Sequence, residues 1–193
     1  MTVSRETYEV VIGLEVHCQL STNTKIYSSD VNAFGGDPNA HVGAITMALP
    51  GTLPKLNSKV LEYAIRMGLA CGSAISRYNI FDRKNYFYPD LPKGYQLTQD
   101  RTPICMGGSI GIGYSDGNVR HLALNRIHIE EDAGKSIHSP ESEGSWIDLN
   151  RAGVPLIEIV TEPDLRSADE AGALLSEIRK LVRYLGICDG NME

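Results

Sequence analysis

The 193-residue sequence has few cysteines, no long apolar run and no excess of positive charge. Its four cysteines, at positions 18, 71, 105 and 188, are far apart and form no C-x-x-C pair, which excludes a zinc knuckle and a dithiol redox motif. No apolar run approaches the about 20 residues of a membrane span, and charged residues near the N-terminus stand where a secretory signal needs an apolar core. We therefore expect a soluble, cytoplasmic protein with free thiols and no membrane partner.

The charge balance limits how the protein could bind nucleic acid. There are 18 Lys and Arg residues against 24 Asp and Glu residues, and the formal net charge is −6. A protein that grips nucleic acid by charge alone has the opposite balance, so such a partner must be met locally or through another subunit. The length predicts one large domain or two small ones, and a chain of this size buries about 70% of the surface that its unfolded form exposes. It therefore needs no disulfides.

Residues 8–20 alternate between apolar and other side chains with a period of two, as expected for a strand with two unlike faces. Glu15, His17 and Gln19 would project from one face at intervals of about 7 Å. A carboxylate beside an imidazole on a rigid backbone suits a hard metal ion, because little entropy is lost in ordering the ligands. A solvated strand face without any ligand would give the same pattern.

Two segments carry the capping residues and the apolar spacing of α-helices. Asn57 can cap a helix that ends near Gly72. Ser167, with Glu170 three residues later, forms a capping box for a second helix, which Gly186 stops. Because apolar residues recur at helical spacing in both segments, we expect both helices to be structural rather than catalytic.

A glycine-rich run at residues 107–113 could suggest a dinucleotide-binding loop, but such a loop must open a helix. Here the apolar residues alternate and a Ser-Asp-Gly-Asn turn follows, which predicts a hairpin instead. The returning strand, residues 119–132, ends in Glu130, Glu131 and Asp132. Three adjacent acids repel one another unless a divalent cation, or ordinary solvation at a loop, offsets their charge.

Two further segments place polar groups in unusual surroundings. Residues 81–96 combine aromatic residues and prolines with Lys84 and Lys93, whose mobile charges suit phosphate; the alternative is an aromatic loop docked on the core. Glu158 lies among aliphatic residues in a strand that Pro155 would start at a bulge or an edge. An isolated carboxylate there would have a raised pKa and would need a partner.

Five segments, taken together and in this order, closely resemble the B-subunit of the aspartyl/glutamyl-tRNA amidotransferases (the GatB/GatE family), and the resemblance covers essentially the whole chain. The segments are residues 13–17, 81–90, 91–96, 126–135 and 150–159. The resemblance implies an α+β fold, with a largely antiparallel sheet and packed helices, like the cradle of glutamine synthetase and the guanidino kinases. It also implies that residues 1–193 form one catalytic cradle domain, truncated at its C-terminus.

The resemblance further implies a ligase that works as a complex. This subunit would use ATP to phosphorylate the side-chain carboxylate of glutamate on glutamine tRNA, or of aspartate on asparagine tRNA, and ammonia would then displace the phosphate. The expected partners are an amidase subunit that releases ammonia from glutamine (the A-subunit), a small third subunit (the C-subunit), and the misacylated tRNA, met mainly through C-terminal regions absent from this chain. The expected cofactors are ATP and Mg²⁺ or Mn²⁺, which suit the same ligands about equally.

Matching the motifs residue by residue also implies a set of site residues. The implied catalytic residues are Glu15, His17 and Glu131, and the implied metal ligands are these three together with Glu130. The implied cofactor-binding residues are Lys84, Asn85, Tyr86, Lys93, Arg126 and Glu158. Simple alternation places Glu130 with Arg126 and His128 on the polar face, whereas the resemblance favours Glu131, so both acids are retained.

Residues 22–54 are rich in Gly, Pro, Asn and Ser, which predicts a loop with short strands. Many family members carry paired cysteines for zinc here, whereas this chain reads Tyr-Ser-Ser-Asp at 27–30 and Gly-Ala-Ile-Thr at 43–46, so we expect no structural zinc. Because the chain stops where family members continue, we expect weak or absent ATP turnover by these residues alone. Two other functions fit the polar strand face: a metal-dependent nucleotide hydrolase that needs no tRNA, and a non-catalytic scaffold for subunit docking.

Overall fold

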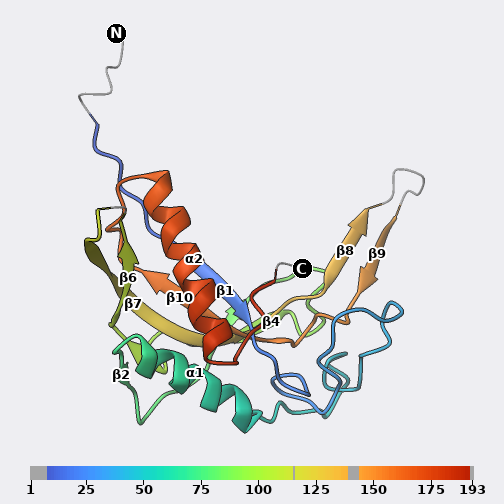
Figure 1. The fold of residues 1–193 in the computed structure, drawn as a ribbon. Helices are drawn as coiled ribbons and strands as arrows, with labels where there is room; N and C mark the ends of the chain where they lie inside the picture. Colours follow the sequence, from blue (N-terminus) through green and yellow to red (C-terminus); the bar gives the residue numbers. More distant parts are fainter. Residues whose placement is uncertain (1–7, 115, 139–143, 192–193) are drawn as a thin grey trace.

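An antiparallel sheet forms the body of the protein, of which the computed structural model describes residues 8–114, 116–138 and 144–191 (Figure 1). The strand order is β1-β10-β7-β5-β2, and β6 pairs with the first half of β7. The strands of this sheet are β1 Glu15–Gln19, β2 Ala74–Ile75, β5 Cys105–Met106, β6 Ser109–Gly113, β7 Val119–Glu131 and β10 Pro155–Thr161. With two helices packed on it, this sheet confirms the predicted α+β fold.

Both predicted helices are present and begin at the predicted caps. Helix α1 spans Ser58–Ala70, and the Asn57 side chain accepts a hydrogen bond from the Lys59 N–H. Helix α2 spans Ala168–Tyr184, and Ser167 Oγ accepts one from the Glu170 N–H at 3.2 Å. The Glu170 carboxylate reaches back to the Arg166 N–H at 2.7 Å, so both partners of the capping box bind free N–H groups at the helix start.

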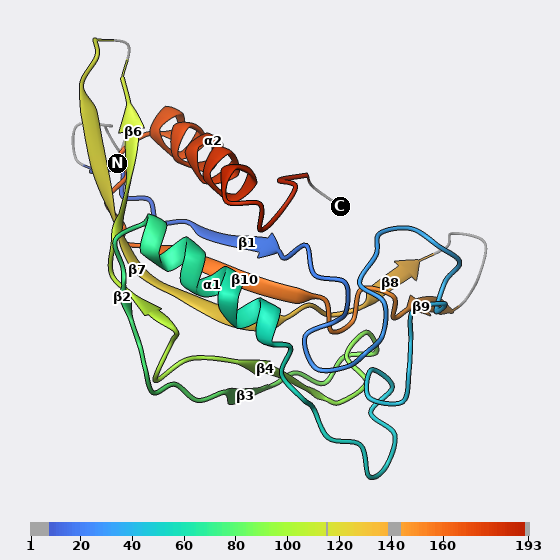
Figure 2. The same cartoon turned by 60° about the horizontal axis from the view of Figure 1, so that its bottom comes forward.

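The two helices cover one face of the sheet and share a single hydrophobic core with it (Figures 1 and 2). The core residues of the helices are Val60, Ala64 and Met67 in α1 and Leu174, Ile178 and Val182 in α2. The sheet contributes, among others, Cys18, Ile127, Ile129, Ile157 and Ile159. Because side chains alternate along a strand, the opposite face of β1, β10 and β7 carries the polar residues of these strands.

Strand β7 contains a β-bulge at Asn125, between the pairs Leu124–Thr161 and Arg126–Val160. The bulge changes which residues face the core. The buried apolar residues are Leu122 and Leu124 before it, and Ile127 and Ile129 after it. Arg126 and the alternate residues that follow it are therefore turned to the polar face of the sheet.

Two ribbons extend from the sheet. Strands β3 (Asp82–Asn85) and β4 (Tyr95–Thr98) form one ribbon, and β8 (Lys135–His138) and β9 (Ser145–Asp148) form a second, which projects from the body in Figure 1. The end of β4 and the residue after it lie beside the end of β7, because Gln99 Oε1 accepts a hydrogen bond from the Ile129 N–H at 3.1 Å. The first ribbon thus borders the polar face of the sheet.

Several local predictions can be compared with this fold. The glycine-rich run forms β6 and pairs with β7 as a hairpin, although Ser115 of its turn lies outside the described residues. The predicted strand 8–20 is regular only over Glu15–Gln19, because β10 pairs with that part alone. Pro155 does open β10, but the predicted edge position is wrong, since β10 lies between β1 and β7. Among the described residues, no helix is long and apolar enough to cross a membrane.

Candidate functional site

Four side chains from three neighbouring strands meet on the polar face of the sheet. Registers across the sheet place His17 of β1 opposite Glu158 of β10, and Glu158 opposite His128 of β7. Glu130 follows two residues after His128, on the same face of β7. We call these four residues the acid–histidine cluster. Three paired strands fix its backbone positions, so the side chains are placed by rigid structure rather than by loops.

The cluster is held together by short polar contacts. His17 Nε2 lies 2.9 Å from Glu130 Oε1 and 3.3 Å from Glu158 Oε2. His128 Nε2 lies 3.2 Å from Glu158 Oε2 and 3.5 Å from Glu130 Oε2, and Thr98 Oγ1 donates to Glu130 Oε2 at 3.1 Å. The His17 side chain is 58% exposed, whereas that of Glu130 is 5% exposed. The cluster is therefore anchored inside the protein and reached from solvent at His17.

These contacts keep both carboxylates ionised. Burial opposes ionisation of Glu130, but hydrogen bonds from His128 and His17 outweigh it and lower its pKa to about 2. Hydrogen bonds from the same two histidines hold the pKa of Glu158 well below its ordinary value. Hydrogen bonds to Glu130 and Glu158 raise the pKa of His17 to about 10. The predicted isolated carboxylate at 158 is thus a partnered one, and its pKa moves down rather than up.

The donor set fits a hard divalent cation. One donor atom each from His17, Glu130 and Glu158 can be chosen so that all three lie within 4.8 Å of one another. Ligand oxygens lie about 2.0–2.6 Å from Mg²⁺ or Ca²⁺, so donors this close can share one ion. Two carboxylates and one imidazole suit Mg²⁺ or Mn²⁺. A cation would take the place of the His17 proton between the carboxylates, because a metal-binding imidazole must be neutral.

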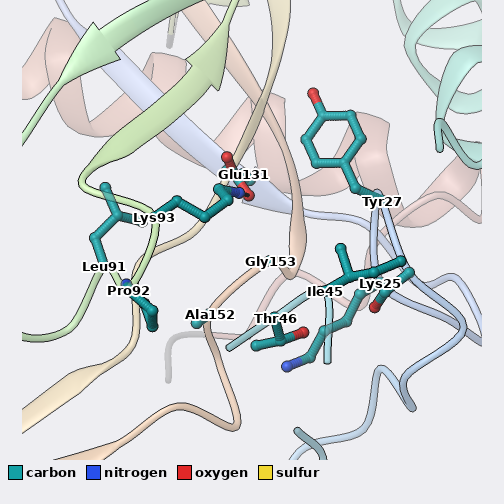
Figure 3. A pocket seen from close by; sticks show the side chains of 11 residues that line it. Lys25, Tyr27, Ile45, Thr46, Leu91, Pro92, Lys93, Glu131, Ala152 and Gly153 are labelled. Carbon is teal, nitrogen blue, oxygen red and sulfur yellow. Dashed lines mark hydrogen bonds and ion pairs between the residues drawn. The ribbon is translucent and has the colours of Figure 1, made fainter. Parts of the chain in front are cut away.

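Glu131 lies in a separate pocket, shown in Figure 3. Its Oε2 forms an ion pair with Lys93 Nζ, and its Oε1 accepts a hydrogen bond from the Leu97 N–H at 2.8 Å. Lys93 Nζ also lies 5.6 Å from the centre of the Tyr27 ring. The pocket is lined further by Lys25, Ser28, Ile45, Thr46, Leu91, Pro92, Ala152 and Gly153. We call it the Lys93–Glu131 pocket, after the ion pair on one of its sides.

The three consecutive acids at the end of β7 and just after it therefore have three different sets of partners. Glu130 belongs to the acid–histidine cluster, and Glu131 pairs with Lys93. Asp132 accepts a hydrogen bond from Gln19 Nε2 at 3.1 Å and lies 3.6 Å from Arg151 Nε. Of the two predicted ways to offset their charge, the prediction of solvation at a loop is wrong, because Glu130 and Glu131 are buried. Protein side chains offset the charge instead.

The structure brings together some of the predicted site residues and separates others. His17, Glu130 and Glu158 meet in the cluster. Glu15 starts β1 on the same face but is exposed and, among the described contacts, does not reach the cluster. Arg126 lies on β7 near Asp100, with 3.6 Å between the charged atoms. Three predicted cofactor contacts are exposed at the β3–β4 ribbon and, among the described interactions, make no contact with the cluster: Lys84, Asn85 and Tyr86.

The choice between the two predicted metal-binding acids now has a geometric basis. After the bulge at Asn125, residues 126, 128 and 130 share the polar face, so Glu130 reaches His17 while Glu131 points into the Lys93–Glu131 pocket. The arrangement agrees with simple alternation and favours Glu130 over the acid that the resemblance favoured. Which acid binds a metal ion stays a prediction.

Sequence reasoning missed the supporting residues. His128 contacts both carboxylates and Thr98 donates a hydrogen bond to Glu130, but neither is among the predicted site residues. The signal for His128 was its position two residues before Glu130, on the same face of the strand. Lys25 and Tyr27, which line the Lys93–Glu131 pocket, lie in a loop whose composition gives no such signal. Their positions depend on the fold of this loop, which its composition does not predict.

Comparisons with known proteins point to one family. Residues 10–193 match the family profile described as the GatB/GatE catalytic domain. Among similar curated proteins is the B-subunit of the aspartyl/glutamyl-tRNA(Asn/Gln) amidotransferase of Nitratidesulfovibrio vulgaris, 57% identical over 187 residues, which covers 97% of this chain and 39% of that protein. The proteins of the same name from a Synechococcus and a Nostoc species are 56% and 52% identical, and 39% and 41% of their lengths are covered. The chain spans about two fifths of the relatives it matches.

Proposed function

The chain belongs to the GatB/GatE catalytic-domain family, and we propose that it carries the site at which a tRNA-linked carboxylate is activated for amide formation. Its relatives are subunits of aspartyl/glutamyl-tRNA amidotransferases, so the proposed substrates are glutamate on glutamine tRNA and aspartate on asparagine tRNA. We infer that the chain acts within a complex, whose other proposed members are an amidase (the A-subunit) together with a small C-subunit.

A free carboxylate is a poor electrophile, so amide formation needs a better leaving group. In the proposed reaction a carboxylate oxygen attacks the γ-phosphorus of ATP, ADP leaves, and an acyl phosphate forms. Ammonia from the amidase then attacks the acyl carbon, the C–O bond to phosphate breaks, and inorganic phosphate leaves as the amide forms. This sequence uses one ATP and one ammonia for each amide.

The observation that carries the proposal is the acid–histidine cluster. Substrate carboxylate and triphosphate are both anionic, and a bound Mg²⁺ or Mn²⁺ supplies the positive charge that offsets their repulsion. Glu130, which is buried, and Glu158, which is partly buried, are both ionised and are the proposed anionic ligands; His17 is the proposed ligand at the exposed side. The buried His128 contacts both carboxylates, in the way that outer hydrogen bonds orient metal ligands.

Other charged residues fit supporting roles in this proposal. Arg126, on the same strand face as the cluster, is a proposed contact for the phosphates of ATP. Five more residues stay in the proposed site, and none of them contacts the cluster in the described interactions: Glu15, Lys84, Asn85, Tyr86 and Lys93. The net charge of −6 agrees with a protein that does not hold tRNA by charge alone.

The test is amide formation on glutamyl-tRNA by the assembled complex, with ammonium as the nitrogen donor. Full-length proteins carrying His17→Ala or Glu158→Gln are compared with the parent and with Glu177→Gln, an acid on α2 that pairs with Lys180. We expect both cluster variants to assemble but to lose at least about 100-fold in amide formation and in Mn²⁺ affinity, and the control to keep both. Normal amide formation by the cluster variants would refute the proposal; ATP hydrolysis that needs no charged tRNA would favour the nucleotide hydrolase.

A further inference from the structure

We propose that Asp30 is a carboxylate clasp, a positioning residue that closes the loop between β1 and α1 and holds one wall of the Lys93–Glu131 pocket. The inference goes beyond the proposed function, because it concerns how the pocket is built and not what reacts in it. It predicts that the loop opens, and the pocket with it, when the carboxylate is removed.

The clasp joins two parts of the loop that are 13 residues apart in sequence. Asp30 Oδ2 accepts hydrogen bonds from the Gly43 N–H at 2.8 Å and from Thr46 Oγ1 at 2.5 Å. The backbone of Asp30 is itself fixed, since its N–H donates to Ser28 Oγ and its carbonyl accepts from the Lys25 N–H. One side chain therefore connects residues 25–30 with residues 43–46.

Few other polar contacts hold the second part of the loop. Among the hydrogen bonds of the described residues, those that tie 43–52 to the rest of the protein go to Asp30. The remaining ones close turns within the segment, such as the Met47 N–H to the Gly43 carbonyl. The loop contains no helix or named strand, only an isolated bridge between Thr24 and Val31. Without Asp30, the segment would lose its main polar attachment.

Gly43 shows how closely the clasp is packed. A Cβ atom at this position would lie 2.2 Å from Asp30 Oδ1, which no real contact allows. A side chain at position 43 would therefore displace the Asp30 carboxylate from its present position. Asp30 thus contacts the Ser28 hydroxyl, the Gly43 N–H and the Thr46 hydroxyl.

The clasped segments form the wall of the pocket opposite the Lys93–Glu131 ion pair. Lys25, Ile45 and Thr46 gather on that side in Figure 3. Lys25 is 1% exposed, and its Nζ donates one hydrogen bond, at 3.3 Å, to the Leu149 carbonyl. Burial lowers the pKa of Lys25 to about 8, and the charges of Asp30 and Asp148 partly offset this effect. The clasp thus encloses an amine that would otherwise be in water.

The first test measures the opening of the loop in the intact chain. Asp30→Ala is compared with Asp37→Ala, an exposed acid of the same loop that is not part of the clasp. Two readouts are used: acetylation of the Lys25 amine by acetic anhydride, followed by mass spectrometry, and hydrogen exchange of the Gly43 amide. We expect both to rise on the order of tenfold or more in Asp30→Ala and to stay at the parent value in Asp37→Ala.

Milder variants keep the proposal testable if Asp30→Ala does not fold. Thr46→Val removes one donor to the clasp, and Thr46→Ser restores it, so faster Gly43 exchange in the first and not in the second supports the clasp. In a double-mutant cycle, Gly43→Ala is expected to cost stability in the parent and much less in the Asp30→Ala background. Unchanged exchange and labelling in both Asp30→Ala and Thr46→Val would overturn the proposal. Failure of the amidation test would leave the exchange and labelling readouts unaffected.

Discussion

The partners of each acidic residue in β7 depend on the face of the sheet to which its side chain points. Glu130 and Glu131 are adjacent in sequence and both buried, yet one meets two histidines and the other meets Lys93. Each acid has a positive or hydrogen-bonding partner of its own. Identical side chains one residue apart are therefore expected to have different functions.

The two acids should respond differently to the same substitution. We expect Glu130→Gln in the full-length protein to weaken Mn²⁺ binding by at least about tenfold, because it removes a charged donor next to His17, and Glu131→Gln to change it by less than about threefold. Manganese titration followed by electron paramagnetic resonance measures both. A greater loss in Glu131→Gln would restore the assignment that the resemblance implies.

Lys25 should leave a signature in the pH dependence of stability. Its pKa in the folded protein is about 8, against 10.5 as its ordinary value, so between these pH values the unfolded chain holds a proton that the folded chain has lost. Stability of the parent relative to Lys25→Met should therefore rise from pH 8 to pH 10.5 and stay level below pH 8. Urea denaturation of both proteins across this range measures the difference, and a relative stability that falls over it would contradict the burial of a charged amine.

The site could be predicted from the sequence only in part. Period-two alternation found the polar face with His17, and the aliphatic surroundings of Glu158 correctly signalled a need for a partner. The partner itself was not readable, because it depends on how β1, β10 and β7 align. His128 and Thr98 escaped for the same reason: their roles come from neighbouring strands and not from their own segment.

At the scale of elements, helix α2 is held at its start by several polar contacts. Ser167 Oγ accepts from the Glu170 N–H, and the Glu170 carboxylate accepts from the Tyr114 hydroxyl and from Arg120. The helix therefore connects its own first turn to the β6–β7 hairpin. Loss of the cap would weaken both the helix and this connection.

We expect Ser167→Ala to lower the free energy of unfolding by about 1 kcal/mol, because the cap hydrogen bond is lost. Ser176→Ala, the same change within α2, serves as the control: Ser176 Oγ bonds only the Gly172 carbonyl of its own helix, and alanine is the better helix former. Thermal and urea unfolding measure both. Equal losses in the two variants would show that the cap contributes nothing specific.

The helices were predictable and the sheet less so, for a physical reason. A helix closes its hydrogen bonds within one segment, so Asn57 and Ser167 marked both starts correctly. A strand's length depends on its partners, and residues 8–14 form no named strand because β10 pairs only with Glu15–Gln19. The bulge at Asn125 was not predicted, since no local pattern distinguishes it from the strand around it.

At the scale of the whole molecule, the exposure of the cluster to solvent at His17 affects the rate of ATP hydrolysis that we expect. The chain covers 39% of the first relatives it matches, and the His17 side chain is 58% exposed. Catalytic phosphoryl transfer depends on a site that excludes water. We expect this 193-residue chain alone to hydrolyse ATP at the background rate, measured by phosphate release with charged tRNA present. Robust tRNA-dependent hydrolysis by the chain alone would show that these residues form a complete site.

Zinc content is a second property of the whole molecule. None of the four cysteines forms a disulfide. Burial raises the pKa of Cys71 to about 11 and that of Cys105, where the charge of Cys71 adds to the effect, to about 12. Thiols with such values stay protonated at neutral pH and bind zinc poorly. We expect well under one zinc per chain by elemental mass spectrometry after purification without chelators, and a stoichiometric value would contradict the prediction.

The bulge in β7 has a consequence for how this gene can vary. Its single extra residue changes the parity of the strand, so that Leu124 before it and Ile127 and Ile129 after it all face the core, while His128 and Glu130 belong to the acid–histidine cluster. Leu124 and Arg126 pair with consecutive residues of β10, so deleting Asn125 would leave a regular ladder with the same residues facing the core and the cluster. Descendants of this sequence are therefore free to substitute or to lose residue 125, because neither change moves His128 or Glu130 from the polar face.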